Sequence, residues 1–175
     1  MRDPKKLRVV PEAEELAVQT QQELIALIRA LRPTAIADKG LAAALRDYTS
    51  DWQRRMGVDV KLHTHGTPIT PLESEETLFR VAQEALANVA HHSQARQVEI
   101  DLTWSGDQIH LTIRDNGKGF DLARAAGKGV GLSSMRERVE ALHGTLLIAS
   151  SSAGTTIEVF APLATPVPAS RGGNA

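Results

Sequence analysis

The chain has 175 residues, of which 42% are hydrophobic and 23% charged, a balance typical of one globular domain with an appendage. Its 20 basic and 21 acidic residues leave a formal net charge of −1, so there is no basic footprint for nucleic acid. Cysteine is absent, which excludes disulfides and thiolate chemistry, and no apolar run is long enough for a membrane helix. We therefore expect a soluble, cytoplasmic protein.

Two helices are predicted before residue 58. Apolar residues recur every three or four positions in residues 12–32, and Pro33 ends this helix because the residue before a proline avoids the α region. A second helix is predicted over residues 38–56, with Gly57 as its C-terminal stop. Both helices are too short and too one-sided to enclose a core of their own.

Strands and helices alternate in the rest of the chain. The apolar spacing predicts a strand over 58–62, a helix over 72–92, a hairpin over 98–104 and 109–113, a helix over 130–142 and a second hairpin over 146–149 and 155–160. This order predicts an α+β fold, a two-layer sandwich in which helices cover one face of a mixed, largely antiparallel sheet. Residues 163–175 have no apolar pattern and are expected to form a disordered tail.

Three polar residues, Glu84, Asn88 and His92, follow one another at four-residue spacing in the helix 72–92, so they share one face. A solvated stripe is the simplest interpretation and is favoured on this pattern alone. Asparagine is a poor residue inside a helix, however, and Asn88 stands between apolar neighbours. A functional stripe is therefore the alternative.

Five of the 13 glycines fall between residues 117 and 131, which indicates unusual backbone dihedrals or close approach to another group. The segment DNGKGF, residues 115–120, follows a predicted strand and has one glycine more than a turn requires. The segment GKGVGL, residues 127–132, opens directly into a helix, whose free N–H groups suit an anion such as phosphate. It is not a Walker A sequence, and alone it is a weak signal.

Together, these features resemble the ATP-binding fold shared by sensor histidine kinases, type II topoisomerases and Hsp90-like chaperones (the Bergerat fold). They are most similar to the nitrate-sensor and DesK-like group of histidine kinases. That group's E-x-L-x-N-x-x-K-H-[SA] motif is matched by residues 84–93, its G-L-x-x-M-x-E-R motif by residues 131–138, and its upstream L-R-P motif by residues 31–33. The resemblance runs from about residue 12 to residue 163.

The resemblance implies that the chain binds ATP and Mg²⁺ and acts as a protein histidine kinase. Asp115 would accept a hydrogen bond from the adenine amine, supported by Thr155, and Gly117 and Gly119 would let the backbone approach the base. Asn88 would hold Mg²⁺. The resemblance further implies a catalytic role for Glu84, which would polarise the nucleophile, phosphate contacts from His92, Lys128, Gly129 and Gly131, and a lid over residues 121–128.

The same resemblance divides the chain into a helical lead-in with a remnant of the dimerisation hairpin (1–57), the ATP-binding domain (58–163) and the tail (164–175). The group's phospho-acceptor motif is not found here, since the first histidine is His63. We therefore expect a fragment that acts on the phospho-acceptor helix of the same kinase. A response regulator is another expected partner. A second copy of this chain is also expected, in a homodimer formed through the N-terminal helix. The full protein is expected to be a cytoplasmic kinase or a membrane-bound sensor with this part in the cytoplasm.

Departures from the group's pattern concern histidines. His91 stands where the group has lysine, so a fixed positive charge near the phosphates is lost or becomes dependent on pH.

The other histidines are outside the motifs. His63 and His65 share one face of a predicted strand, but no third zinc ligand is evident. His110 and His143 are most simply surface residues.

Two other functions remain open at the level of sequence. One is a stand-alone serine kinase of the anti-sigma type, which has the same fold but usually lacks the helical lead-in found here. The other is a catalytically silent nucleotide-binding module, against which the retained Glu84, Asn88 and Asp115 argue.

Overall fold

The computed structural model describes residues 34–163, with gaps at 68–69 and 123–129. The predicted helix over 12–32 and the predicted tail over 164–175 lie outside this described part. The described elements are α2 (Thr34–Met56), β1 (Asp59–His65), α3 (Leu72–Asn88), the π-helical turn η1 (Val89–Ser93), β2 (Gln97–Ser105), β3 (Gln108–Asp115), α5 (Val130–Ala141), β4 (Thr145–Ser151) and β5 (Gly154–Pro162). None of these helices is both long and apolar enough to span a bilayer.

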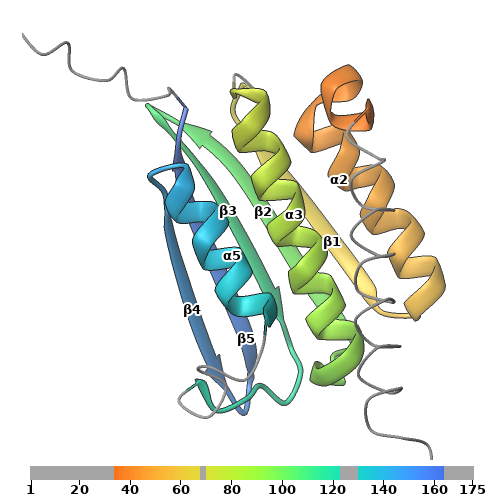
Figure 1. Ribbon diagram of the computed structural model, residues 1–175. Helices are drawn as coiled ribbons and strands as arrows, with labels where there is room; N and C mark the ends of the chain where they lie inside the picture. Colours follow the sequence, from red (N-terminus) through yellow and green to blue (C-terminus); the bar gives the residue numbers. More distant parts are fainter. Residues whose placement is uncertain (1–33, 68–69, 123–129, 164–175) are drawn as a thin grey trace, which may run out of the picture. The chain divides into compact units, whose positions relative to one another are not determined.

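The strands form a five-stranded sheet in the order β1-β2-β3-β5-β4. Strand β1 pairs with β2 in parallel, and the other three neighbouring pairs are antiparallel. Helices α2, α3 and α5 lie side by side over one face of this sheet (Figure 1). The predicted two-layer α+β sandwich with a mixed, largely antiparallel sheet is confirmed.

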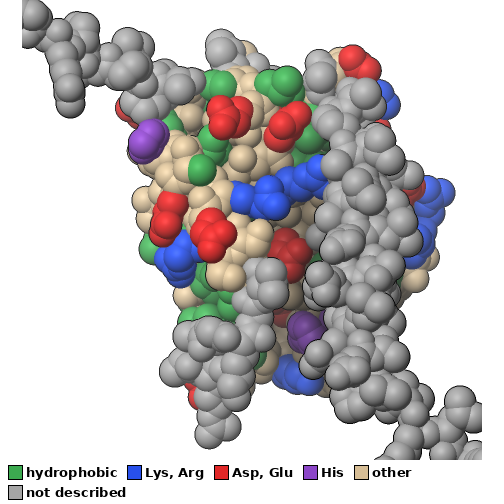
Figure 2. Space-filling model, viewed as in Figure 1, with side chains coloured by type: hydrophobic (Ala, Val, Ile, Leu, Met, Phe, Trp, Pro, Cys, Tyr) green, Lys and Arg blue, Asp and Glu red, His purple; other side chains and the backbone are tan. Residues whose placement is uncertain are grey.

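The core lies between the helices and the sheet, because every second residue of the inner strands points toward the helices. In β2, for example, Val98, Ile100 and Leu102 are fully buried, whereas the residues between them are half-buried. The helices supply the opposite layer: Leu41, Leu45, Trp52, Leu78, Val81, Leu86, Met135 and Val139. On the helix-covered face, acidic and basic side chains are interspersed, in keeping with the near-zero net charge (Figure 2).

Helix α2 shares this core, so it belongs to the same compact unit as the sheet. That unit begins at Ile36. The division at residue 57 that the resemblance implies stays a prediction. Leu41, Leu45 and Trp52 pack with the sheet, and the Tyr48 ring meets the Phe79 ring of α3 edge-on at a centroid distance of 5.6 Å.

Two predicted helices differ in detail from the observed ones. Gly40 has a φ of 74° and interrupts α2, so the long regular helix begins after it and not at Asp38. The predicted helix over 72–92 is α-helical only to Asn88, and its last turn is the wider π turn η1.

Candidate functional site

A cavity of about 300 Å³ opens between α3, the start of α5 and the ends of β3 and β5. Its apolar wall consists of Ala85, Val89, Ile113, Phe120, Leu132 and Ile157. Six of the predicted site residues line it: Asn88, His92, Asp115, Gly119, Gly131 and Thr155. The structure therefore brings most of the predicted site together from separate segments of the chain.

Asp115 ends strand β3 directly beside Thr155, its register partner on β5. One carboxylate oxygen, Oδ1, accepts a hydrogen bond of 2.8 Å from the backbone N–H of Gly117. A carboxylate has about four acceptor positions, so this bond orients the group and leaves acceptor capacity for a ligand. Asp115 is half-buried, which makes it a directional acceptor in the cavity wall.

The glycine turn after Asp115 is clamped on both sides. The side-chain oxygen of Asn116 accepts hydrogen bonds from the backbone N–H groups of Arg96 and Gln97, at 2.9 and 3.0 Å. The backbone N–H of Lys118 donates to the carbonyl oxygen of Ser93 at 2.8 Å. These bonds fix the turn to the end of η1 and to the start of β2.

Gly117 and Gly119 pack so closely against neighbouring backbone that no side chain fits at either position. A Cβ on Gly117 would overlap the carbonyl oxygen of Ser93, and a Cβ on Gly119 would overlap that of Ser151. The resemblance had implied that both glycines make room for the base. The structure shows close approach of both glycines to the neighbouring backbone. Gly119 lines the cavity and Gly117 does not, and their approach to a base stays a prediction.

The π turn η1 is closed by Ser93. Its hydroxyl donates to the carbonyl oxygen of Val89 at 3.1 Å and accepts from the backbone N–H of Ala95 at 3.0 Å, while Gln94 adopts a left-handed φ of 57°. This turn carries His92 to the cavity, and π turns are often found at functional sites. His91 is exposed and does not line the cavity.

Glu84 lies beside the start of α5. A Cβ on Gly131 would overlap the Glu84 carboxylate, so the glycine permits this close approach. The carboxylate thereby lies near the positive end of the helix dipole. Glu84 does not line the cavity itself but is next to Gly131, which does. Lys128 and Gly129, and the predicted lid beyond residue 122, lie outside the described residues.

Three residues that sequence reasoning did not assign contribute to the site. Phe120 lines the cavity at its rim. Ser93 and Ser150 hold the glycine turn. The Ser93 carbonyl oxygen accepts from the backbone N–H of Lys118, and the Ser150 hydroxyl accepts from that of Phe120 at 2.9 Å. Ser93 is part of the recognised motif, so it carried a signal. Serine near the end of a strand is too common for Ser150 to have carried one.

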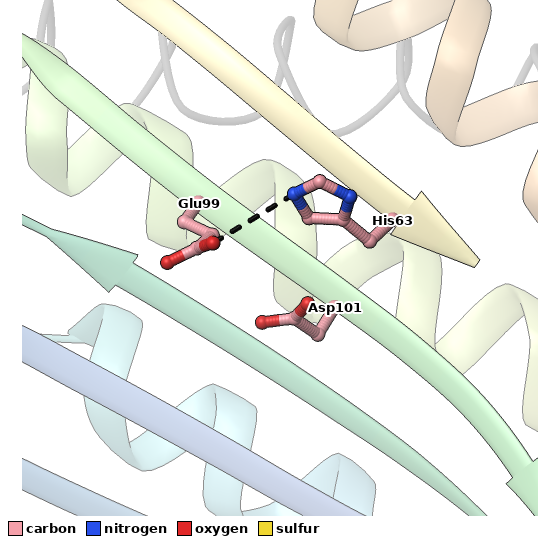
Figure 3. Close-up of side chains that lie close together, drawn as sticks. All are labelled: His63, Glu99 and Asp101. Carbon is pink, nitrogen blue, oxygen red and sulfur yellow. Dashed lines mark ion pairs between the residues drawn. The ribbon is translucent and has the colours of Figure 1, made fainter. Parts of the chain in front are cut away.

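The predicted pair His63 and His65 shares the sheet face opposite the helices. There His63 lies close to Glu99 and Asp101 of β2, with all three ligand atoms within 4.8 Å of one another (Figure 3). The Nε2 atom of His63 is 3.7 Å from Glu99, and a guanidinium nitrogen of Arg114 is 3.1 Å from Asp101, so a side-chain partner already lies beside each carboxylate. His110 and Glu158 form a similar pair at 3.8 Å.

Comparison with known proteins agrees with this geometry. Residues 73–165, just over half of the chain, match the model of the family described as histidine kinase-, DNA gyrase B- and HSP90-like ATPases. The chain belongs to this ATPase family. The matched range contains the whole cavity wall described above.

Curated relatives of this ATPase-family chain include a sensor histidine kinase and a sensor protein. The sensor histidine kinase LiaS of Bacillus subtilis is 34% identical over 92% of this chain and 45% of its own length. The sensor protein VraS of Staphylococcus haemolyticus is 36% identical over 88% of this chain and 44% of its own length. This chain thus spans about half the length of these relatives.

The fold also matches solved structures of histidine kinases. The histidine kinase AdeS of Acinetobacter baumannii superposes with a TM-score of 0.62 over 90% of this chain and 87% of that one, at 14% identity. At this identity the likeness concerns the fold of the ATPase domain, in agreement with the sheet order and the helix layer.

Proposed function

We propose that this chain is the ATP-binding domain of a sensor histidine kinase, which binds ATP with Mg²⁺ and donates the γ-phosphoryl group to a histidine outside these residues. The observation that carries the proposal is the convergence of Asn88, Asp115, Thr155 and Gly131 on one cavity. These residues come from α3, β3, β5 and α5, so their convergence is not a by-product of one local motif.

The cavity suits an adenine base. Its volume of about 300 Å³ is in the range of small-molecule sites, and its wall is largely apolar with few polar groups. The Asp115 carboxylate would accept a hydrogen bond from the exocyclic amine, and the Ala85, Ile113 and Ile157 side chains would pack against the flat ring.

The donor set also fits Mg²⁺. Magnesium binds through one or two protein oxygens and keeps the remaining positions for water and phosphate oxygens. The amide oxygen of Asn88, half-buried in the cavity wall, would supply one such ligand. When bound, the ion supplies charge neutralisation at the phosphate oxygens.

The residues near the start of α5 would act on the phosphate end. Backbone N–H groups at this helix start favour anions, and Gly131 lets the Glu84 carboxylate approach the same helix start closely. His92 would contact a phosphate, and the nearby Glu84 carboxylate would polarise the incoming histidine. Phosphoryl transfer requires mainly positioning and charge stabilisation from the protein. Contacts from Lys128 and Gly129 stay predictions.

The chain's own histidines are poorly placed to receive the phosphoryl group. His63, His65 and His110 lie on the sheet face opposite the helices, and His143 lies in the turn after α5. His91 is exposed and does not line the cavity. His92 lines the cavity, but it is held in the π turn η1, where it would contact a phosphate. An acceptor helix of the same kinase, with a response regulator as the next acceptor, is therefore the proposed route.

The two rival functions are less well supported. Both curated relatives are sensor proteins, and their matches cover about nine tenths of this chain, including part of the segment before the ATPase domain. That extent favours a sensor kinase over a stand-alone serine kinase. The presence of Glu84, Asn88 and Asp115 favours an active domain over a silent module. Dimerisation through the N-terminal helix and a cytoplasmic location stay predictions.

Labelling with γ-³²P-ATP tests the transfer step. The chain alone should incorporate no acid-labile phosphate, whereas a phospho-acceptor segment from a histidine kinase of this group, added in trans, should be labelled. Glu84→Gln and Asn88→Ala should abolish that labelling, and Glu137→Gln, an exposed position on α5, should not. Self-labelling at His91 or His92, or labelling of a serine in the acceptor segment, would contradict the proposal.

A further inference from the structure

The hydroxyl groups of Ser150 and Thr155 form a short chain behind the cavity wall. The backbone N–H of Phe120 donates to the Ser150 oxygen at 2.9 Å, and the Ser150 and Thr155 oxygens are 3.0 Å apart. Strand register places the two side chains next to each other, because Ser150 of β4 pairs directly with Thr155 of β5. Ser150 does not line the cavity, whereas Thr155 and Phe120 do.

The Phe120 amide favours one direction for this chain. An N–H group can only donate, so it occupies one lone pair of Ser150 and leaves the Ser150 proton available for donation. The Thr155 hydroxyl is the neighbouring group that can accept this proton. If Ser150 donates to Thr155, the Thr155 proton is free to turn toward the cavity. Hydrogen bonds in such a chain polarise one another, which favours one common direction.

We propose that Ser150 is a positioning residue that fixes Thr155 as a hydrogen-bond donor beside the acceptor Asp115 and thereby selects adenine over guanine. This inference rests on the proposed function. Asp115 and Thr155 are register partners on β3 and β5, so the cavity presents an acceptor and a donor side by side. Adenine offers the complementary pair, an amine donor next to a ring nitrogen acceptor, whereas guanine presents an oxygen acceptor next to an N–H donor.

Ser150 also fixes the position of the glycine turn. Its bond to Phe120 ties that turn to β4 at the residue that begins the rim of the cavity. The close packing of Gly119 against Ser151 holds the same contact from the other side. Loss of the Ser150 hydroxyl would therefore release a lone pair of the Thr155 oxygen and the Phe120 amide. The Thr155 hydroxyl could then rotate and present either a donor or an acceptor to the cavity.

The test compares the dissociation constants of Mg·ADP and Mg·GDP for the full chain and its variants. Ser150→Ala should weaken ADP binding about five- to tenfold and narrow the ADP-to-GDP preference. Ser150→Thr keeps the hydroxyl and should keep the ADP-to-GDP preference. Ser150→Val has the same shape as Ser150→Thr but no hydroxyl, and it should lose the preference. Ser151→Ala is the matched control, because its hydroxyl only accepts from Ala153 in an exposed turn.

A double-mutant cycle separates positioning from general loosening. In a Thr155→Val background the receiving hydroxyl is absent, so Ser150→Ala should narrow the nucleotide preference no further. Two results would refute the inference and leave the proposed function standing, provided that the unsubstituted chain binds ADP. One is an equal ADP-to-GDP preference in Ser150→Val and Ser150→Thr. The other is that the effects of Ser150→Ala and Thr155→Val on this preference simply add. If the unsubstituted chain binds neither nucleotide, the proposed function fails and the inference with it.

Discussion

Asp115 carries the assignment of the cavity to adenine, since its carboxylate is the acceptor held at the end of β3 by the Gly117 amide. Asp115→Asn keeps the shape but places an N–H donor against the adenine amine. We expect adenine nucleotide affinity to fall at least about tenfold, measured by titration of a fluorescent ATP analogue. Asp107→Asn, in the exposed β2–β3 turn, removes the same charge and should change nothing. Equal affinities for both variants would make Asp115 a turn residue only.

Gly119 and Gly106 form a natural pair for separating backbone strain from packing. Their φ angles are nearly equal, 60° and 61°, but a Cβ on Gly106 would meet nothing within 4 Å, whereas one on Gly119 would overlap the Ser151 carbonyl. Gly106→Ala should lower the free energy of unfolding in urea by about 1 kcal/mol. Gly119→Ala should lower it further and should alone weaken nucleotide binding. Equal free energies of unfolding and equal nucleotide affinities in Gly106→Ala and Gly119→Ala would refute the packing role of Gly119.

At the scale of elements, helix α2 is expected to behave as part of the ATPase domain. Leu45 is completely buried in the core that α2 shares with the sheet. Leu45→Ala should lower the free energy of unfolding by about 2–5 kcal/mol, whereas the exposed neighbour Arg46→Ala should stay within about 0.5 kcal/mol of the unsubstituted chain. Urea denaturation measures both. Unchanged unfolding of the sheet in Leu45→Ala would instead favour a domain boundary at residue 57.

The start of α3 contains a buried carboxyl group whose burial affects stability. Burial raises the pKa of Glu75 above its ordinary value, and a backbone hydrogen bond from Leu41 partly offsets this. The native state therefore holds the Glu75 proton more tightly than the unfolded state does, so this group's contribution to stability falls as pH rises through the folded pKa. Consequently, Glu75→Gln should gain stability relative to the unsubstituted chain as pH rises from 4 to 7. Denaturant unfolding at several pH values checks this, and a difference independent of pH would contradict it.

Much of the element pattern could be predicted from sequence because one face of each inner strand packs on the helices. The alternation of Val98, Ile100 and Leu102 located β2 for this reason. The π turn could not be predicted, because it depends on a contact between residues that are distant in the sequence. Ser93 closes the turn and also packs against the glycine turn that follows β3. The amphipathic stripe of α2 indicated that this helix packs against another surface, but such a stripe does not say which surface covers it.

At the scale of the whole molecule, the site is an assembly of distant segments, which limited its prediction. Asn88 and Asp115 were recognised because they stand in motifs with a fixed spacing. The role of Ser150 could not be predicted, since its two partners are Phe120, thirty positions earlier in the chain, and Thr155 on the paired strand. Strand register pairs Ser150 with Thr155, and the glycine turn after β3 brings Phe120 to Ser150. Local pattern therefore predicted the groups that would contact a nucleotide, but not those that hold them in place.

Equilibrium dialysis of radiolabelled ATP against the 175-residue chain tests the nucleotide site most directly. With Mg²⁺ present, we expect saturable binding at a single site that excess ADP displaces. EDTA or the Asn88→Ala substitution should weaken that binding, because few other protein ligands are available to the ion. The absence of saturable ATP binding by the folded chain, with or without Mg²⁺, would contradict the assignment of the cavity.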